Sequence, residues 1–224
     1  MALDTPMLAL DHAQGHAEGG VCRTALGEGA ALLRGFAAGR APGLVAAIDA
    51  IAALSPFRHM VTPGGWTMSV ALTNCGRVGW ITDRAGYRYG AVDPATGRPW
   101  PEMPPSFACL AAEAAEAAGF PGFRPDACLI NRYAPGARLS LHQDRDEQDF
   151  AQPIVSVSLG VPAVFLWGGE TRAGKARRVP LVHGDVVVWG GPDRLRFHGV
   201  HTVAEGEHEL TGAYRFNLTF RRAL

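Results

Sequence analysis

Two segments of the chain carry apolar residues at the spacing of a helix. The first, 42–54, opens with Pro42, and proline is well tolerated in the first turn of a helix. The second, 105–118, is closed by Gly119 and followed by Pro121, a common stop signal. Both segments are rich in alanine, so we expect two helices that serve packing rather than chemistry. The stripe of the first helix, with a period near 3.6, consists of Leu44, Val45, Ile48, Ile51 and Leu54.

Most of the remaining chain alternates between apolar and polar positions, which is typical of strands. Turn signals such as Gly168-Gly169 separate short pieces. Many short strands after a helical segment predict a mainly β fold with flanking helices (α+β), an antiparallel jelly roll or barrel with the helices packed outside. Segment 76–105 is rich in turn residues and aromatic residues, and we expect a long binding loop there. The predicted strands are 66–74, 127–133, 154–160, 163–167, 179–182, 185–189 and 213–221.

Length and composition limit the class of protein. The chain has 224 residues, enough for one large domain or two small ones. Lysine and arginine total 21, as do aspartate and glutamate, which excludes a polybasic tail and an acidic disordered chain. None of the four cysteines stands in a CxxC pair, so we expect neither a disulfide framework nor a cysteine-only zinc site. We expect residues 1–22 to be a poorly ordered lead-in and residues 23–224 to form a single domain.

The apolar runs are too short for a membrane protein. None approaches the roughly 18 residues that a spanning helix needs. The run at 7–10 is also too short for the core of a signal peptide. We therefore expect a cytoplasmic protein that does not bind a membrane.

A histidine and a carboxylate stand two residues apart at His142 and Asp144. On an extended segment both side chains point the same way. With His198 they form the two-histidine, one-carboxylate set that leaves open positions on Fe(II) for a co-substrate and oxygen. A short His-x-Asp is by itself more often a surface turn than a pair of ligands. The competitors for the third position are His183, His201 and His208.

The last predicted strand, 213–221, separates two kinds of side chain. A period of two puts its polar residues on one face and its large apolar residues on the other. Taken alone, this pattern favours a polar face turned to water. On the strand 127–133, however, Asn131 and Tyr133 also share a face. Two arginine side chains beside an amide and a phenol could together bind a small dicarboxylate, because arginine forms paired, charge-assisted hydrogen bonds with a carboxylate. The polar residues of the last strand are Arg215, Asn217, Thr219 and Arg221.

Five motifs follow one another along the chain: MSVALTNCG at 68–76, NRYAPG at 131–136, HQD at 142–144, HGDVVVW at 183–189 and RxNxxxR at 215–221. Together they resemble the AlkB family closely, from about residue 29 to residue 222. The resemblance implies a double-stranded β-helix and an Fe(II)/2-oxoglutarate dioxygenase that uses O2 to repair alkylated bases. The chain departs from the family pattern at Trp66, where we expect tyrosine, and at Leu72, where we expect methionine.

The resemblance also assigns residues to roles. The implied iron ligands are His142, Asp144 and His198. The implied 2-oxoglutarate residues are Asn131, Tyr133, Arg215, Asn217 and Arg221. The residues implied to contact the damaged base and its strand are Trp80, Tyr87, Tyr89, Asp146 and Arg172.

The segment 66–105 is expected to recognise nucleotides on its composition as well. Between residues 66 and 98, four arginines oppose two aspartates, a local charge of +2 (4 − 2) in a neutral protein, as phosphate contact requires. Among its aromatic residues we expect Trp80 and Tyr87 to contact a base. Trp100 stands between two prolines, and we expect it to anchor the loop to the core.

The expected activity is oxidative demethylation of N-alkylated bases, such as 1-methyladenine and 3-methylcytosine, in DNA or RNA. The products would be the repaired base, an aldehyde, succinate and carbon dioxide. Single-stranded or locally opened DNA should be preferred, because its bases cost least to extrude; we also expect a monomer. Three alternatives are an oxygenase of the same fold acting on RNA, protein or a small molecule, a zinc hydrolase, and a non-catalytic jelly-roll binding module.

Overall fold

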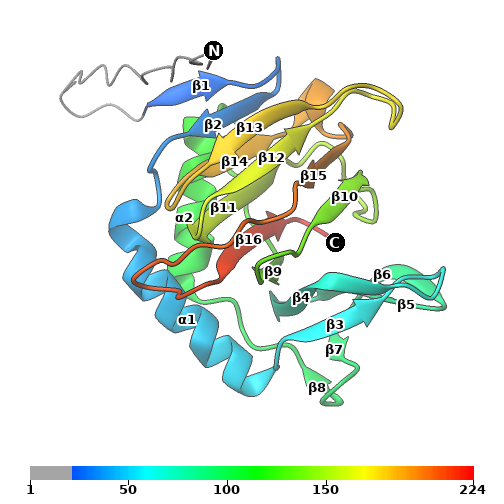
Figure 1. Ribbon diagram of the computed structural model, residues 1–224. Coiled ribbons are helices and arrows are strands. Elements are labelled where there is room, and N and C mark those ends of the chain that lie inside the picture. The colour runs from blue at the N-terminus through cyan, green and yellow to red at the C-terminus, as the bar shows by residue number, and fades with distance from the viewer. Residues whose placement is uncertain (1–21) are drawn as a thin grey trace, which may run out of the picture.

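The computed structural model describes residues 22–224, so the predicted lead-in lies outside the described residues except for Cys22. Two antiparallel sheets face each other, and two helices cover the outer side of the larger sheet (Figure 1). This arrangement confirms the predicted mainly β jelly roll with flanking helices. Among the described residues, no helix is both long and apolar enough to cross a membrane.

The larger sheet has eight strands and the smaller has four. The order of the larger sheet is β1 (Arg23–Ala25), β2 (Ala30–Leu33), β14 (Val186–Trp189), β11 (Ile154–Gly160), β16 (Arg215–Arg221), β9 (Ala127–Tyr133), β4 (Thr67–Gly76) and β3 (Arg58–Val61). The order of the smaller sheet is β10 (Leu139–His142), β15 (His198–Val200), β12 (Ala163–Trp167) and β13 (Arg177–Leu181). Strands distant in sequence therefore lie side by side, as β2 and β14 do.

Both predicted helices are present as α1 (Ala41–Leu54) and α2 (Pro105–Ala117). Short 3-10 turns lie at Ala38–Arg40 and Gly191–Asp193. The helix α2 ends where predicted, because Gly119 adopts a positive φ of 97°, which glycine permits at little cost. The residues that pack the helices onto the larger sheet include Leu44, Ile48, Phe107, Leu110, Val155 and Leu218.

The strand β16 lies between β11 and β9 and is buried on both faces. Its apolar face packs under the helices, whereas its polar face points between the two sheets. The alternation of this strand taken alone favours a polar face turned to water, but Arg215 is 2% exposed and Arg221 5% exposed, as the shared face of Asn131 and Tyr133 led us to expect. A central strand has no face left for water once a second sheet covers it.

The segment 76–105 differs from the long loop that the sequence predicts. It forms two hairpins, β5 (Gly79–Asp83) with β6 (Gly86–Gly90), and β7 (Val92–Asp93) with β8 (Arg98–Pro99). These strands are too short and too rich in glycine and charge to show a clear alternation. Trp100 is 4% exposed and its indole N–H donates to the carbonyl of Gly90 at 2.8 Å, which confirms its predicted role as an anchor.

We expect Phe107→Ala to destabilise the protein strongly. Phe107 is fully buried and meets Phe220 of β16 edge to face, with ring centroids 5.9 Å apart. Removing the ring should cost about 3–5 kcal/mol of unfolding free energy, measured by urea denaturation. Leu54→Ala on α1 is the control, since Leu54 is 66% exposed and should change stability by less than about 0.5 kcal/mol. Equal, small losses for both variants would contradict this packing.

Candidate active site

A large cavity of about 1010 Å³ opens between the two sheets. Its inner wall consists of side chains from β9 and β16, including Asn131, Tyr133, Arg215 and Arg221. Its mouth is formed by residues of the 58–90 region and by exposed residues such as Arg145 and Arg172. Most of the predicted site residues line this one cavity, although they come from many separate strands.

His142, Asp144 and His198 form a compact group whose candidate ligand atoms all lie within 4.8 Å of one another. Strand pairing causes this, because His142 at the end of β10 lies directly opposite His198 on β15. Gly199 lets the two strands approach, since a Cβ there would meet the carbonyl oxygen of Leu139 at 2.6 Å. The two imidazole rings are 4.4 Å apart, and their Nε2 atoms lie 3.6 and 3.7 Å from the two carboxylate oxygens of Asp144.

Both histidines are oriented by backbone carbonyls. Nδ1 of His142 lies 2.9 Å from the carbonyl oxygen of Ser140, and Nδ1 of His198 lies 3.0 Å from that of Arg196. With the proton on Nδ1, each ring keeps its Nε2 lone pair for a ligand. Burial, and then the charge of His198, lower the pKa of His142 to about 4, so this ring is neutral at neutral pH, as a metal ligand must be.

Asp144 is held by a buried arginine. Arg221 donates to Oδ2 of Asp144 from Nε at 3.1 Å and from Nη2 at 2.8 Å. Burial opposes the charge of Asp144, but the charge of Arg221 and the contact with His198 outweigh it, so the pKa of this carboxyl lies well below its ordinary value. Asp144 therefore carries a negative charge and presents its other oxygen, Oδ1, away from the arginine.

Arg215 is a buried cation without a carboxylate. Its Nη2 donates to the hydroxyl of Ser158 at 3.0 Å, but Nε and Nη1 have no hydrogen-bond partner among the described residues. The hydroxyl of Tyr133, whose ring lies 4.9 Å from the guanidinium, is also buried without a partner within 22–224. Burying a charge without a partner is costly. The space beside Arg215 and the hydroxyl of Tyr133 therefore fits a bound anion. A carboxylate suits it well, because its two oxygens can accept two parallel N–H bonds from the planar guanidinium group.

The two arginines of the last strand thus differ. Arg221 is already paired with Asp144, whereas Arg215 has a free fork. Between them on the cavity wall, the amide of Asn131 donates to Oδ1 of Asn217 at 3.1 Å, and that of Asn217 donates to Ser156 at 2.8 Å. The three ligands and the inner wall fit an iron ion and a dicarboxylate in one cavity.

The aromatic residues of the β5–β6 hairpin divide into two groups. Trp80 and Tyr87 stack on each other at the cavity mouth, with ring centroids 5.7 Å apart. The indole N–H of Trp80 donates to Oδ2 of Asp146 at 2.8 Å. Tyr89 does not line the cavity; its hydroxyl donates to Oε1 of Glu147 at 2.6 Å. Arg172 lies at the mouth and donates twice to the carbonyl of Leu141, beside His142.

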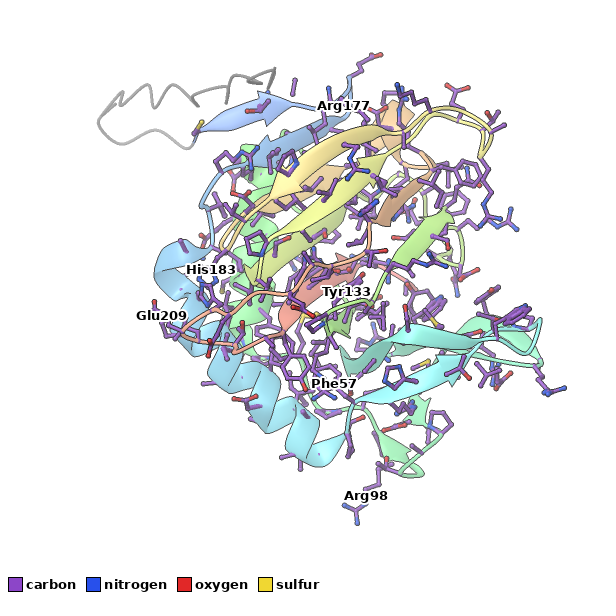
Figure 2. All side chains as sticks on the ribbon, in the orientation of Figure 1. Phe57, Arg98, Tyr133, Arg177, His183 and Glu209 are labelled. Atoms are coloured by element: carbon purple, nitrogen blue, oxygen red, sulfur yellow. The ribbon has the colours of Figure 1, made fainter. Side chains whose placement is uncertain are left out.

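The positive charge predicted for residues 66–98 contributes little to the cavity: one of its arginines is neutralised by a carboxylate, and another lies far from the cavity. Arg88 pairs with Asp83 inside the hairpin at 2.6 Å, and that hydrogen bond lowers the pKa of Asp83 to about 2. Arg98 lies at the outer tip of the β7–β8 hairpin (Figure 2). Neither arginine lines the cavity.

The competing histidines do not join the ligand group. His183 and His208 stack on each other at 4.2 Å, and His183 lies at the edge of the molecule, whereas Tyr133 lies near its centre (Figure 2). Within residues 22–224, the group of metal-ligating type contains only His142, Asp144 and His198.

The sequence does not predict two buried charged residues that lie next to the ligand group, Arg194 and Glu147. Arg194 donates to the backbone carbonyl of Asp144 at 2.7 Å and to Oε2 of Glu147 at 2.9 Å. Both side chains are at most 3% exposed. The sequence carries no local signal for this pair, since each residue stands in a run of polar residues typical of a surface.

Comparisons with known proteins agree with this geometry. A family model described as the 2OG-Fe(II) oxygenase superfamily matches residues 29–221. The alpha-ketoglutarate (2-oxoglutarate)-dependent dioxygenase AlkB of Salmonella typhimurium is 59% identical over 198 residues, which cover 88% of this chain and 92% of that protein. An AlkB homolog of Caulobacter vibrioides is 48% identical over 181 residues, 80% of each chain. The solved structure of OsALKBH1 has a TM-score of 0.77 at 29% identity and covers 89% of this chain and 99% of its own. The chain therefore belongs to the AlkB family of Fe(II)- and 2-oxoglutarate-dependent dioxygenases.

Proposed function

We propose that this dioxygenase repairs N-alkylated bases in nucleic acid, such as 1-methyladenine and 3-methylcytosine, by oxidative dealkylation. One observation carries the proposal. A single cavity combines a three-residue metal-ligand group, a buried arginine with a free fork and an aromatic pair at the entrance. A zinc hydrolase would have no use for Arg215, and a binding module would need no ligand group.

The chain supplies separate sites for each reactant. His142, Asp144 and His198 would hold iron, while Arg215 and the hydroxyl of Tyr133 would bind the distal carboxylate of 2-oxoglutarate. Iron and 2-oxoglutarate, when bound, would let O2 oxidise the alkyl carbon: one oxygen atom becomes the new hydroxyl and the other enters succinate, which leaves with carbon dioxide. The hydroxylated product then breaks its carbon–nitrogen bond: the hydroxyl loses its proton, an aldehyde leaves and the nitrogen keeps the electron pair.

The base would enter beside the aromatic pair. Trp80 is held in place by Asp146 and offers a flat face, and Tyr87 is half exposed next to it. A base must leave its stack before the oxidising centre reaches an N-alkyl group, so single-stranded or locally opened DNA should be at least as good a substrate as intact duplex. The same contacts are open to RNA. We expect one copy of residues 23–224 to carry out the reaction as a monomer.

Asp144→Ala should abolish repair and weaken metal binding by at least about 10-fold, because it removes one of three ligands. Titration of the metal-free protein with Mn²⁺ and a demethylation assay measure the two effects. Asp49→Ala, an exposed carboxylate on α1, is the matched control and should leave both unchanged. Full activity of iron-loaded Asp144→Ala would remove this residue from the site.

Arg215→Met should weaken 2-oxoglutarate binding roughly 10-fold to 150-fold, the equivalent of a charge-assisted hydrogen bond of about 1.5–3 kcal/mol. Methionine fills part of the space and removes only the fork. Anaerobic titration of the metal-loaded protein with 2-oxoglutarate provides the measurement. The control is Arg178→Met on the exposed side of β13. An affinity equal to the wild type would mean that the free fork of Arg215 serves another ligand.

Trp80→Ala should lower repair efficiency roughly 5-fold to 150-fold, since base–aromatic stacking is worth about 1–3 kcal/mol. It should spare 2-oxoglutarate binding, because the indole contacts Asp146 and Tyr87 rather than the inner wall. The two assays are run on the same variant with a methylated oligonucleotide. Normal repair by Trp80→Ala would leave the aromatic pair without a part in base binding.

A further inference from the structure

Two neighbouring acidic residues attach the β5–β6 hairpin to the segment that carries Asp144. Trp80 and Tyr89 lie directly opposite each other in the hairpin, so their side chains share a face. Trp80 donates to Asp146 at 2.8 Å, and Tyr89 donates to Glu147 at 2.6 Å. The first bond is at the exposed mouth of the cavity, whereas the second is in the interior behind it.

Glu147 joins this hairpin to the arginine that orients Asp144. Its side chain is 2% exposed, and Oε2 accepts from Arg194 at 2.9 Å. Oε1, which accepts from Tyr89, also lies 3.3 Å from Nε of Arg221. The same guanidinium donates to Oδ2 of Asp144 at 2.8 Å. A chain of direct polar contacts therefore runs from Tyr89 through Glu147 and Arg221 to Asp144.

The charges along this chain are balanced. Asp144 and Glu147 contribute two negative charges, and Arg194 and Arg221 contribute two positive charges, all largely buried. Burial also raises the pKa of Tyr89 well above its ordinary value, so its hydroxyl keeps the proton that it donates. In a site of low dielectric, moving or neutralising one member changes the partners of the others.

We propose that Glu147 is a positioning residue that couples the base-contacting hairpin to the metal centre. It fixes the guanidinium of Arg221, so that Arg221 binds Oδ2 of Asp144 and leaves Oδ1 to the metal; Tyr89 in turn fixes Glu147. The inference rests on the proposed function, because the metal role of Asp144 is assigned there. Trp80 is the residue paired with Tyr89, so a base that displaces Trp80 would also disturb the contact of Tyr89 with Glu147. Because coupling between two binding sites is reciprocal, metal binding would change the affinity for the base by the same factor.

The test is the affinity of the metal-free, full-length protein for Mn²⁺, read from the paramagnetic resonance signal of the free ion. Glu147→Gln keeps the shape of the side chain and removes its charge. It should weaken binding roughly 10-fold, the lower end of the effect of removing a group that directly holds a metal ligand, because Glu147 acts on Asp144 through Arg221. Tyr89→Phe removes only the hydroxyl and should weaken binding about 5-fold, less than Glu147→Gln, because it removes one hydrogen bond to the carboxylate and leaves the carboxylate's charge in place. Tyr214→Phe, a half-exposed tyrosine outside the cavity, is the matched control and should leave the affinity unchanged.

A double variant separates coupling from general damage to the fold. If the hydroxyl of Tyr89 acts through the charge of Glu147, Tyr89→Phe should change the affinity less than about 2-fold in the Glu147→Gln background. Equal effects of Tyr89→Phe in both backgrounds overturn the proposal. Thermal unfolding of each metal-free variant is recorded alongside. Glu147→Gln removes the charge opposite two buried arginines and should lower the unfolding temperature, so the affinities are compared at a temperature at which every variant is fully folded.

The outcomes also distinguish this proposal from the function on which it rests. A wild-type protein that binds no Mn²⁺ overturns the metal assignment itself. A wild type that binds Mn²⁺ and repairs methylated DNA, with unchanged affinity in Tyr89→Phe, overturns only the coupling. Should Glu147→Gln fail to fold, Tyr89→Phe and Tyr214→Phe still decide the question, because each removes a single oxygen atom.

Discussion

The buried contact between Arg221 and Asp144 is the interaction on which the rest of the site depends. It joins the central strand of the larger sheet to the segment that follows β10 of the smaller sheet. Without the arginine, Asp144 would be a buried charge with a large desolvation cost and two histidines as its neighbours. With it, the carboxylate is charged, oriented and available on one side. The jelly roll thus brings a cation from the C-terminal strand to a carboxylate that lies 77 residues earlier.

Arg215 lies on the same strand as Arg221 but, unlike Arg221, is not paired with a carboxylate of residues 22–224. Six residues from Arg221 and on the same face, it has no acidic partner among the described residues, and burial lowers its pKa from the ordinary value. Folding leaves this guanidinium in an unfavourable state that an anion relieves. An anion bound to this guanidinium would supply the partner that the fold omits, and its affinity would therefore be linked to the stability of the protein.

Pattern and motif predict much of this structure, and the failures have physical causes. The alternation in β16 indicated which residues share a face, but only a second sheet decides whether that face meets water. The strands β10 and β15 have four and three residues and meet at an irregular register, so no periodicity could reveal them. Tyr89 follows the same local pattern as Tyr87, yet its hydroxyl finds a buried carboxylate. That carboxylate, Glu147, is stabilised inside by Arg194, 47 residues away, and local sequence does not encode such a partner.

The cavity has a floor and a rim built from different parts of the chain. The floor belongs to paired strands deep in the two sheets, whereas the rim includes the turn before β4, where Trp66 is 79% exposed, and the β5–β6 hairpin. Exchanging the exposed side chains of the rim, Trp66 and Tyr87, alters little of the packed interior, whereas Tyr89 of the same hairpin belongs to the polar contacts that reach Asp144. The enzyme is consequently a suitable starting point for directed evolution: libraries confined to the rim could search for new alkylated substrates while the oxidation chemistry below stays the same.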